Sequence, residues 1–372
     1  MIRFYLIILF FLISLLSFLK APQYHLWLLA VVVCEFPLVF VGITGLLTLS
    51  GIWIQKYQLA GTIWGLVTII IFLTPIMRAY WVAKDVKPEM SLAFNAKSDD
   101  NDAPFSFWKM FSGNKKVAYR PLTYVEYPDT SLALDFYPSQ IIGKRPCIIV
   151  VHGGSWSGGD SKQLPELNSY LTAKGYNIAA INYRMAPKYQ TPAPVEDIKS
   201  AFTYLRKHAD ELHIDMGNFV LLGRSAGAQI ALLAAYTLHQ PALKGVIDFY
   251  GPADMVWGYS IPSNPLIMDS RKVMDAYVGG SYDQVPKKYF NCSPLVFVGP
   301  QSVPTLIIHG QNDVLVSPEH SRRLNLKLQQ NGIKHYYLKI PWATHGFDYN
   351  LNGPGGQLST YAVETFLNAV TQ

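Results

Sequence analysis

The sequence predicts an α-helical membrane region followed by a doubly wound α/β domain with a mostly parallel sheet. Half of the 372 residues are hydrophobic and only 15% are charged, and the apolar excess lies within residues 1–80. From residue 117 onward, short apolar runs alternate with amphipathic segments. Such alternation is typical of strands and helices in a doubly wound sheet. We therefore divide the chain into a transmembrane region (1–80), a juxtamembrane linker (81–116) and an α/β domain (117–372).

Three apolar segments are long enough to cross a bilayer, at 4–19, 26–49 and 59–77. The first contains no charged residue, and no small-x-small cleavage site follows it, which favours a retained helix over a signal peptide. The second contains Glu35 and Pro37. A carboxyl group at that depth is either part of a proton or substrate relay or, as we prefer, a protonated or interface-facing group beside a proline kink.

The charges around these segments give a weak indication of orientation. Arg3 and Lys56 lie on one predicted side of the membrane, whereas Lys20, Arg78, Lys84 and Lys87 lie on the other. The positive-inside rule then places the large domain on the cytoplasmic face of an integral membrane protein, although one miscounted span would reverse this. In the linker, 98–102 reads as a solvated loop, and the aromatic run 105–111 reads as an interfacial anchor or a flap over the active site.

The α/β domain shows the expected order of elements. We expect strands at 117–127, 132–137, 146–151, 177–182, 218–222, 243–250, 303–309 and 335–340, and helices at 164–174, 195–212, 229–236, 317–330 and 357–370. The first two strands can pair as a hairpin around the turn at 128–131. The continuous apolar runs at 146–151 and 177–182 indicate strands that are buried on both faces.

Ser225 lies between one of these strands and a helix, in the run Gly-Arg-Ser-Ala-Gly at 223–227. A serine at such a turn has a strained backbone, and its flanking glycines avoid collisions with the neighbouring strand and helix. A serine nucleophile needs an imidazole to accept its proton and a carboxylate to orient that imidazole. Asp313 and His345 follow in the order serine, acid, histidine, and each stands in a loop after a strand, so we expect all three at one sheet edge.

A fourth element follows the strand at 146–151, where the chain reads His-Gly-Gly-Ser-Trp at 152–156. A tetrahedral oxyanion needs backbone N–H donors that already point at its oxygen. We expect these donors from Gly154 and Ser155, or from Gly153 and Gly154, together with Ala226.

These motifs resemble the α/β-hydrolase superfamily, and within it the hormone-sensitive-lipase-like and feruloyl-esterase-like carboxylesterases. The resemblance covers residues 117–372 and rests on 152–156, 182–187, 192–197, 223–227, 293–295, 309–313 and 345–347. It implies that Ser225 is the nucleophile, His345 the general base and acid, and Asp313 the orienting carboxylate. Two positions depart from the lipase-like pattern, since Ser155 replaces a third glycine and Arg224 replaces an acid.

Other polar residues near these motifs have structural interpretations. We expect His152 and His309 to brace their loops, and Arg184 to form a buried ion pair with Asp197. Asp348 is a rival for the orienting acid, but it follows His345 by only three residues and would have to fold back.

The insertion at 252–302 is rich in aromatic residues and lies where a lid is common in this fold. We expect Trp257 and Tyr259 from this insertion, together with Trp156, to contact substrate. The predicted function is therefore a membrane-anchored serine carboxylic ester hydrolase whose small-molecule or lipid substrate has a lipidic or aromatic acyl group. The alternatives are an arylformamidase, amidase or peptidase with the same triad, since kynurenine formamidases share His-Gly-Gly-x-Trp, and a non-catalytic membrane receptor on a hydrolase scaffold.

Other functional classes are disfavoured by composition. The net charge of +6 comes from scattered lysines and arginines rather than from a basic helix, so we expect no nucleic-acid partner. The three cysteines, Cys34, Cys147 and Cys292, form neither a close pair nor a metal-binding spacing. We expect no metal and no cofactor, and the sequence leaves the oligomeric state open.

Overall fold

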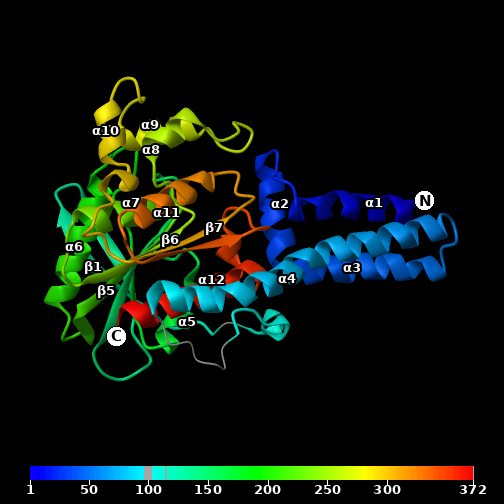
Figure 1. Cartoon of the computed structure of the whole chain (residues 1–372), viewed down its shortest axis with the longest axis horizontal. Helices are drawn as coiled ribbons and strands as arrows, with labels where there is room; N and C mark the ends of the chain where they lie inside the picture. Colours follow the sequence, from blue (N-terminus) through cyan, green and yellow to red (C-terminus); the bar gives the residue numbers. More distant parts are fainter. Residues whose placement is uncertain (96–102, 114, 372) are drawn as a thin grey trace.

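The computed structural model describes residues 1–95, 103–113 and 115–371. It consists of an α/β body, residues 117–371, from which a bundle of apolar helices projects (Figure 1). The loop expected at 98–102 lies outside the described residues.

The body is built on one eight-stranded sheet with the strand order β1-β2-β4-β3-β5-β6-β7-β8. β1 and β2 form the expected antiparallel hairpin, β2 also pairs antiparallel with β4, and the remaining neighbours are parallel. The strands are β1 Arg120–Tyr127, β2 Thr130–Tyr137, β3 Arg145–Val151, β4 Asn177–Ile181, β5 Ile214–Arg224, β6 Leu243–Phe249, β7 Thr305–Gly310 and β8 His335–Ile340. The doubly wound, mostly parallel sheet is as predicted.

Helices cover both faces of this sheet, so successive strand residues enter two different cores. Ile149 packs with residues of α6 and α7 on one face, whereas its neighbour Ile148 packs with residues of α5 and α12 on the other. The body helices are α5 Pro165–Ala173, α6 Ala193–Lys207, α7 Ala226–Thr237, α11 Glu319–Gln330 and α12 Pro354–Val370. The insertion at 252–302, called the lid segment below, contains α8 Met255–Ser260, α9 Ser270–Val278 and α10 Pro286–Asn291.

The bundle consists of α1 Ile2–Ser14, α3 Pro37–Leu49 and the first half of α4 Gln58–Phe94, which run side by side (Figure 1). α2 Tyr24–Glu35 crosses the base of the bundle, between it and the body. The chain bends by 87° between α2 and α3. The bend falls at Phe36, because Pro37 disfavours helical backbone in the residue before it and starts a new helix readily.

The second predicted span, 26–49, is therefore two helices rather than one straight segment. α4 is the one helix among the described residues that is long and apolar enough to cross a membrane by itself, and the bent pair would make a second if it counts as one span. By length and composition this is weak support for a membrane region, and the three predicted spans stay a prediction.

The predicted linker is wrong at its amino-terminal end, because α4 continues from Gln58 through Trp81 to Phe94. Its second half packs on the body through Val86, Met90 and Phe94, which recur every four residues and are all buried. Polar and charged residues between these positions obscure the helical repeat in the sequence. The aromatic run at 105–111 contains a short 3₁₀ helix, Phe107–Phe111, in which Phe107 N donates to Tyr80 Oη of α4 at 3.4 Å.

Candidate active site

Ser225 stands at a sharp turn between β5 and α7, with φ of 53° and ψ of −121°. Both flanking glycines are required by close backbone contacts. A Cβ on Gly223 would lie 2.4 Å from Ala228 Cα, and one on Gly227 would lie 2.2 Å from the carbonyl oxygen of Val151. The left-handed φ of a serine is costly, and the packing of helix against strands holds it in place. The turn therefore presents the Ser225 hydroxyl at the carboxyl edge of the sheet.

The structure brings Ser225, His345 and Asp313 together from three separate loops. His345 Nε2 lies 2.9 Å from Ser225 Oγ, and His345 Nδ1 lies 2.7 Å from Asp313 Oδ2. The imidazole thus bridges the hydroxyl and the carboxylate, which is the geometry expected for a proton relay from a serine.

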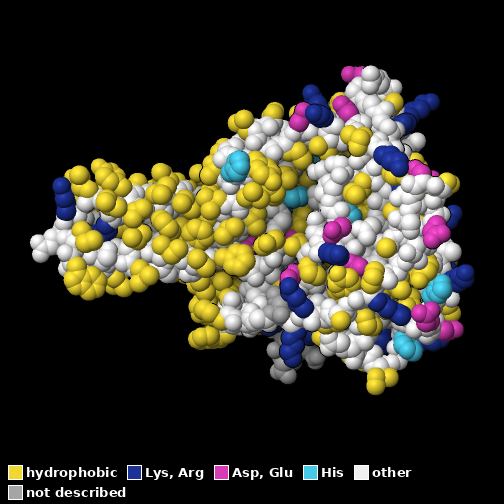
Figure 2. All heavy atoms as spheres, turned by 180° about the vertical axis from the view of Figure 1, so that it is seen from behind, with side chains coloured by type: hydrophobic (Ala, Val, Ile, Leu, Met, Phe, Trp, Pro, Cys, Tyr) yellow, Lys and Arg dark blue, Asp and Glu magenta, His cyan; other side chains and the backbone are white. Residues whose placement is uncertain are grey.

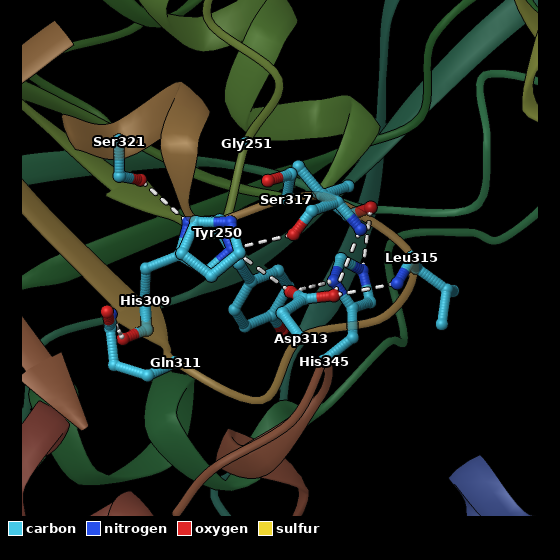
Figure 3. A network of polar contacts seen from close by, with 12 residues as sticks. Tyr250, Gly251, His309, Gln311, Asp313, Leu315, Ser317, Ser321 and His345 are labelled. Carbon is cyan, nitrogen blue, oxygen red and sulfur yellow. Dashed lines mark hydrogen bonds and ion pairs between the residues drawn. The ribbon is translucent and has the colours of Figure 1, made fainter. Parts of the chain in front are cut away.

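Asp313 is buried and held by donors on both oxygens (Figure 3). Its Oδ1 accepts from the backbone N–H groups of Leu315 and Val316, at 2.9 Å each, while Oδ2 also lies 3.1 Å from His309 Nε2. Burial raises the pKa of Asp313, but the charge of His345 and the hydrogen bonds from His309 and His345 outweigh it and hold the pKa well below its usual range. The carboxylate therefore stays ionised at neutral pH, and His309 braces its loop as expected.

Asp348, the rival acid, belongs to a different buried group. It forms an ion pair with Arg224 and accepts a hydrogen bond from the Tyr250 hydroxyl. Arg224, which departs from the lipase-like pattern, thus has an acidic partner within the chain. The expected pair of Arg184 and Asp197 is also present, with 2.8 Å between Nε and Oδ1.

The loop at 152–156 lies against the nucleophile. A Cβ on Gly153 would come within 3.3 Å of Ser225 Cβ, so this glycine allows the close approach. Gly154 has φ of +124°, and a Cβ on it would lie 2.1 Å from the carbonyl oxygen of Gly158, so it allows the tight turn of the loop. The N–H of Gly153 donates to Gln163 Oε1 at 2.7 Å, which counts against it as an oxyanion donor. Gly154 and Ser155 are then the loop's candidates, and Ala226 N–H belongs to the first turn of α7, which leaves its N–H groups without partners inside the helix. His152 stacks on Tyr183 at a centroid distance of 4.3 Å, as expected for a bracing residue.

Two cavities meet at Ser225. The first, called the lid cavity, has a volume of about 410 Å³ and extends toward the lid segment; its walls include Trp156, Ile261, Met274, Val316 and His320. The second, called the α2 cleft, has a volume of about 710 Å³; its walls include Trp27, Leu28 and Val32 of α2, as well as Gly154 and His345. Both volumes lie within the range of small-molecule sites.

The aromatic residues predicted to contact substrate lie in different places. Trp156 lines the lid cavity, although it is mostly buried by stacking on Tyr277 and by a hydrogen bond from its Nε1 to Gln229. The prediction for Trp257 and Tyr259 is wrong, since both line a separate depression beside Arg271 and Arg323. Their rings pack on His320 and Tyr289 respectively, so they stabilise the lid segment rather than face Ser225.

Sequence reasoning missed the residues of α2 that line the α2 cleft. The hydropathy of 26–49 predicts a membrane span, which would separate Trp27 and Leu28 from the site. Three sequence features could have indicated that this segment is not one straight span. Tyr24 and Trp27 are residue types that favour a membrane interface, and Pro37 favours a break in the helix.

The chain matches a known protein family. The model of the BD-FAE family matches residues 134–328, which is more than half of the chain. The chain belongs to the BD-FAE family. The match includes Ser225 and Asp313, whereas the bundle and α2 lie outside it.

Curated relatives of this chain include esterases. Esterase LipC of Mycobacterium tuberculosis is 29% identical over 240 residues, covering 60% of this chain and 58% of LipC. The probable carboxylic ester hydrolase LipM of the same organism is 26% identical over 243 residues, covering 62% of this chain and 56% of LipM. The chain thus spans little more than half the length of these relatives.

Solved structures show the same fold. The carboxylesterase EstE1, cloned from a metagenomic library, superposes with a TM-score of 0.61 at 17% identity, covering 79% of this chain and 98% of its own. Bacterial heroin esterase superposes with a TM-score of 0.61 at 20% identity, covering 71% of this chain and 88% of its own. The body therefore has the α/β-hydrolase fold.

Proposed function

We propose that the chain is a serine hydrolase that cleaves carboxylic esters through an acyl-enzyme. The observation that carries this proposal is the hydrogen-bonded series from Ser225 Oγ through the His345 ring to Asp313, at 2.9 and 2.7 Å. Esterase relatives within the same family support an ester as the substrate.

In the proposed reaction, Ser225 Oγ attacks the ester carbonyl carbon while His345 Nε2 accepts the hydroxyl proton. Asp313 keeps the other ring proton on Nδ1 and stabilises the imidazolium that forms. The carbonyl oxygen becomes an oxyanion that Ala226 N–H and the 154–155 loop can bind. The carbon–oxygen bond to the alcohol then breaks, and His345 gives its proton to the leaving oxygen. Water repeats these steps to release the acid.

We also propose that the bundle anchors the body in a membrane. Its surface is apolar, with Leu46 71% and Leu59 75% exposed, whereas the polar side chains of Arg3, Thr44 and Thr68 are buried inside. Large exposed apolar surfaces mark membrane or protein contacts. Polar residues that face the interior of a helix bundle are typical of a lipid environment. The enzyme would then act on esters at or near a lipid surface.

The Ser225→Ala variant tests the catalytic proposal. We expect kcat for p-nitrophenyl ester cleavage to fall at least about a thousandfold, since the alanine cannot form an acyl intermediate. Ser200→Ala, on α6 away from both cavities, is the matched control and should keep its activity.

Two other results would point to the alternative functions. Faster turnover of N-formyl or peptide substrates than of esters would indicate an amidase. Failure of the wild-type protein to react with a fluorophosphonate probe would contradict a serine hydrolase and favour a non-catalytic role.

A further inference from the structure

α2 is fixed against the body at both ends. Near its start, Trp27 Nε1 donates to the carbonyl oxygen of His345 at 3.1 Å. At its end, the buried Glu35 side chain accepts from Gly355 N at 3.0 Å, and its carbonyl oxygen accepts from Asn350 Nδ2 at 2.8 Å. These contacts join α2 to the loop that carries His345 and to the start of α12. α2 is therefore held firmly in place as one wall of the α2 cleft.

The outer side of this wall is open. Tyr24, Leu28 and Val32 all line the α2 cleft, yet they are 45%, 42% and 42% exposed. They are spaced four residues apart and so lie along one face of the helix. Val31, which also lines the cleft, is buried on the inner side. An apolar chain can therefore run from the molecular surface past Leu28 to Ser225.

This opening adjoins the apolar surface of the bundle. Figure 2 shows hydrophobic side chains covering the bundle and continuing onto the neighbouring part of the body. The exposed apolar residues of the bundle include Leu12, Val39, Leu46, Leu59 and Leu66. Under the proposed anchoring, a lipid could pass from the bilayer to the α2 cleft without exposing its hydrocarbon to water.

The position of His345 indicates which part of an ester would occupy the α2 cleft. Within the described part of the chain, His345 and Gly346 line this cleft but do not line the lid cavity. His345 Nε2 must reach the oxygen of the leaving alcohol to protonate it. The alcohol portion is therefore expected on the side of the cleft that the imidazole faces, and the acyl portion in the lid cavity.

We infer that the α2 cleft binds the apolar alcohol portion of a membrane-borne ester, which enters and leaves along α2. This inference rests on the proposed ester hydrolysis and adds the substrate class and its orientation. As the bond between the acyl carbon and the alkoxy oxygen breaks, the electron pair stays on that oxygen and the proton from His345 Nε2 neutralises it. The acyl group remains on Ser225, and the long-chain alcohol returns along α2 to the lipid.

The test uses the full chain in lipid vesicles with two substrate series. One series consists of acetates of alkyl alcohols from butyl to hexadecyl, and the other of p-nitrophenyl esters from acetate to dodecanoate. The ratio of kcat/KM between the longest and shortest member measures chain selectivity in each series. Leu28→Trp should fill the cleft and lower the alcohol selectivity at least tenfold, since each buried methylene is worth roughly a factor of four.

Two variants serve as comparisons. Ile261→Trp, which lines the lid cavity only, should lower the acyl selectivity and leave the alcohol selectivity within about twofold. Leu46→Trp, on the exposed surface of α3, should change neither ratio.

Three results would overturn the inference. The first is a loss of acyl rather than alcohol selectivity in Leu28→Trp. The second is no change in either ratio with kcat/KM itself unchanged. The third is no change in either ratio with an equal loss of kcat/KM for all substrates, which would make α2 a purely structural wall. If the wild-type protein cleaved no ester and resisted fluorophosphonate, the failure would lie in the proposed function itself.

Discussion

The bundle and the body arrange the same kinds of side chain in opposite ways. In the body, strand residues such as Ile149 and Leu221 are fully buried, and many charged side chains are scattered over the surface. In the bundle, Leu46 and Leu59 face outward, while Thr44 and Thr68 are buried. The same rule produces both arrangements, because apolar groups leave water and polar groups seek partners. The proposed membrane anchoring would account for the exposed apolar surface of the bundle.

Their buried arginines illustrate this contrast. In the body, Arg224 pairs with the carboxylate of Asp348. In the bundle, Arg3 instead donates to the carbonyl oxygens of Leu47 and Thr48, at 2.9 and 3.0 Å. Gly51 and Gly61 leave room for its guanidinium, since a Cβ on either would lie within 2.7 Å of it. Small residues at helix contacts are common in membrane bundles.

The largest effect is expected from changing the buried carboxylate that the proposed mechanism requires. Asp313→Asn should lower kcat by about 10⁴-fold with little change in structure, because the amide no longer holds the productive His345 tautomer. Asp348→Asn is the matched comparison, since that carboxylate pairs with Arg224 and does not touch His345 in this arrangement. The kcat of correctly folded Asp348→Asn protein should fall by at most about tenfold. If kcat for ester cleavage fell more in Asp348→Asn than in Asp313→Asn, Asp348 rather than Asp313 would be the orienting acid.

A smaller effect should distinguish the outer surfaces of the two regions. Leu66→Arg, on the exposed side of α4, should cost about 2.5–3.5 kcal/mol if lipid surrounds the bundle. Ile142→Arg, on a loop of the body where the side chain is 99% exposed, should stay within about 0.5 kcal/mol. The fraction that remains in membranes after an alkaline carbonate wash measures the difference. Equal retention of both variants would argue against a lipid-facing bundle.

The smallest effect concerns the interior of the bundle. Arg3→Met should lower bundle stability by roughly 1.5–3 kcal/mol, the usual contribution of hydrogen bonds to a charged group. Denaturation by SDS in mixed micelles, followed by circular dichroism, measures it. Lys56→Met, at an exposed position in the loop between α3 and α4, is the control and should be nearly neutral. An unchanged transition for Arg3→Met would show that its contacts add nothing to the bundle.

The proximity of Ser225, Asp313 and His345 could be predicted because each belongs to a local pattern. Ser225 sits in a strand-turn-helix motif, and Asp313 and His345 each follow a strand of a parallel sheet, so topology alone brings them to one edge. The place of α2 could not be predicted in this way. Its residues are as apolar as those of a membrane span, and hydropathy does not distinguish a helix in lipid from one that lies against a protein cavity. The break at Phe36 was visible only as a proline.

The errors in the lid segment and the linker have a related cause. Composition shows that an insertion is aromatic, but not which rings face a cavity, so Trp257 and Tyr259 were assigned to substrate although they pack on His320 and Tyr289. In α4, only the register of Val86, Met90 and Phe94 against the body decides that the helix continues. Both features depend on tertiary contacts between distant parts of the chain.

α4 runs without interruption from the bundle to the body, where Phe94 packs on Phe366 of α12. At 1.5 Å per residue, its 37 residues form a rod about 55 Å long. A body held on such a rod cannot swing as it would on a loose tether. Under the proposed anchoring and mechanism, Ser225 stays at one height above the bilayer, and turnover should follow the surface density of the ester in the membrane rather than its concentration in bulk solution.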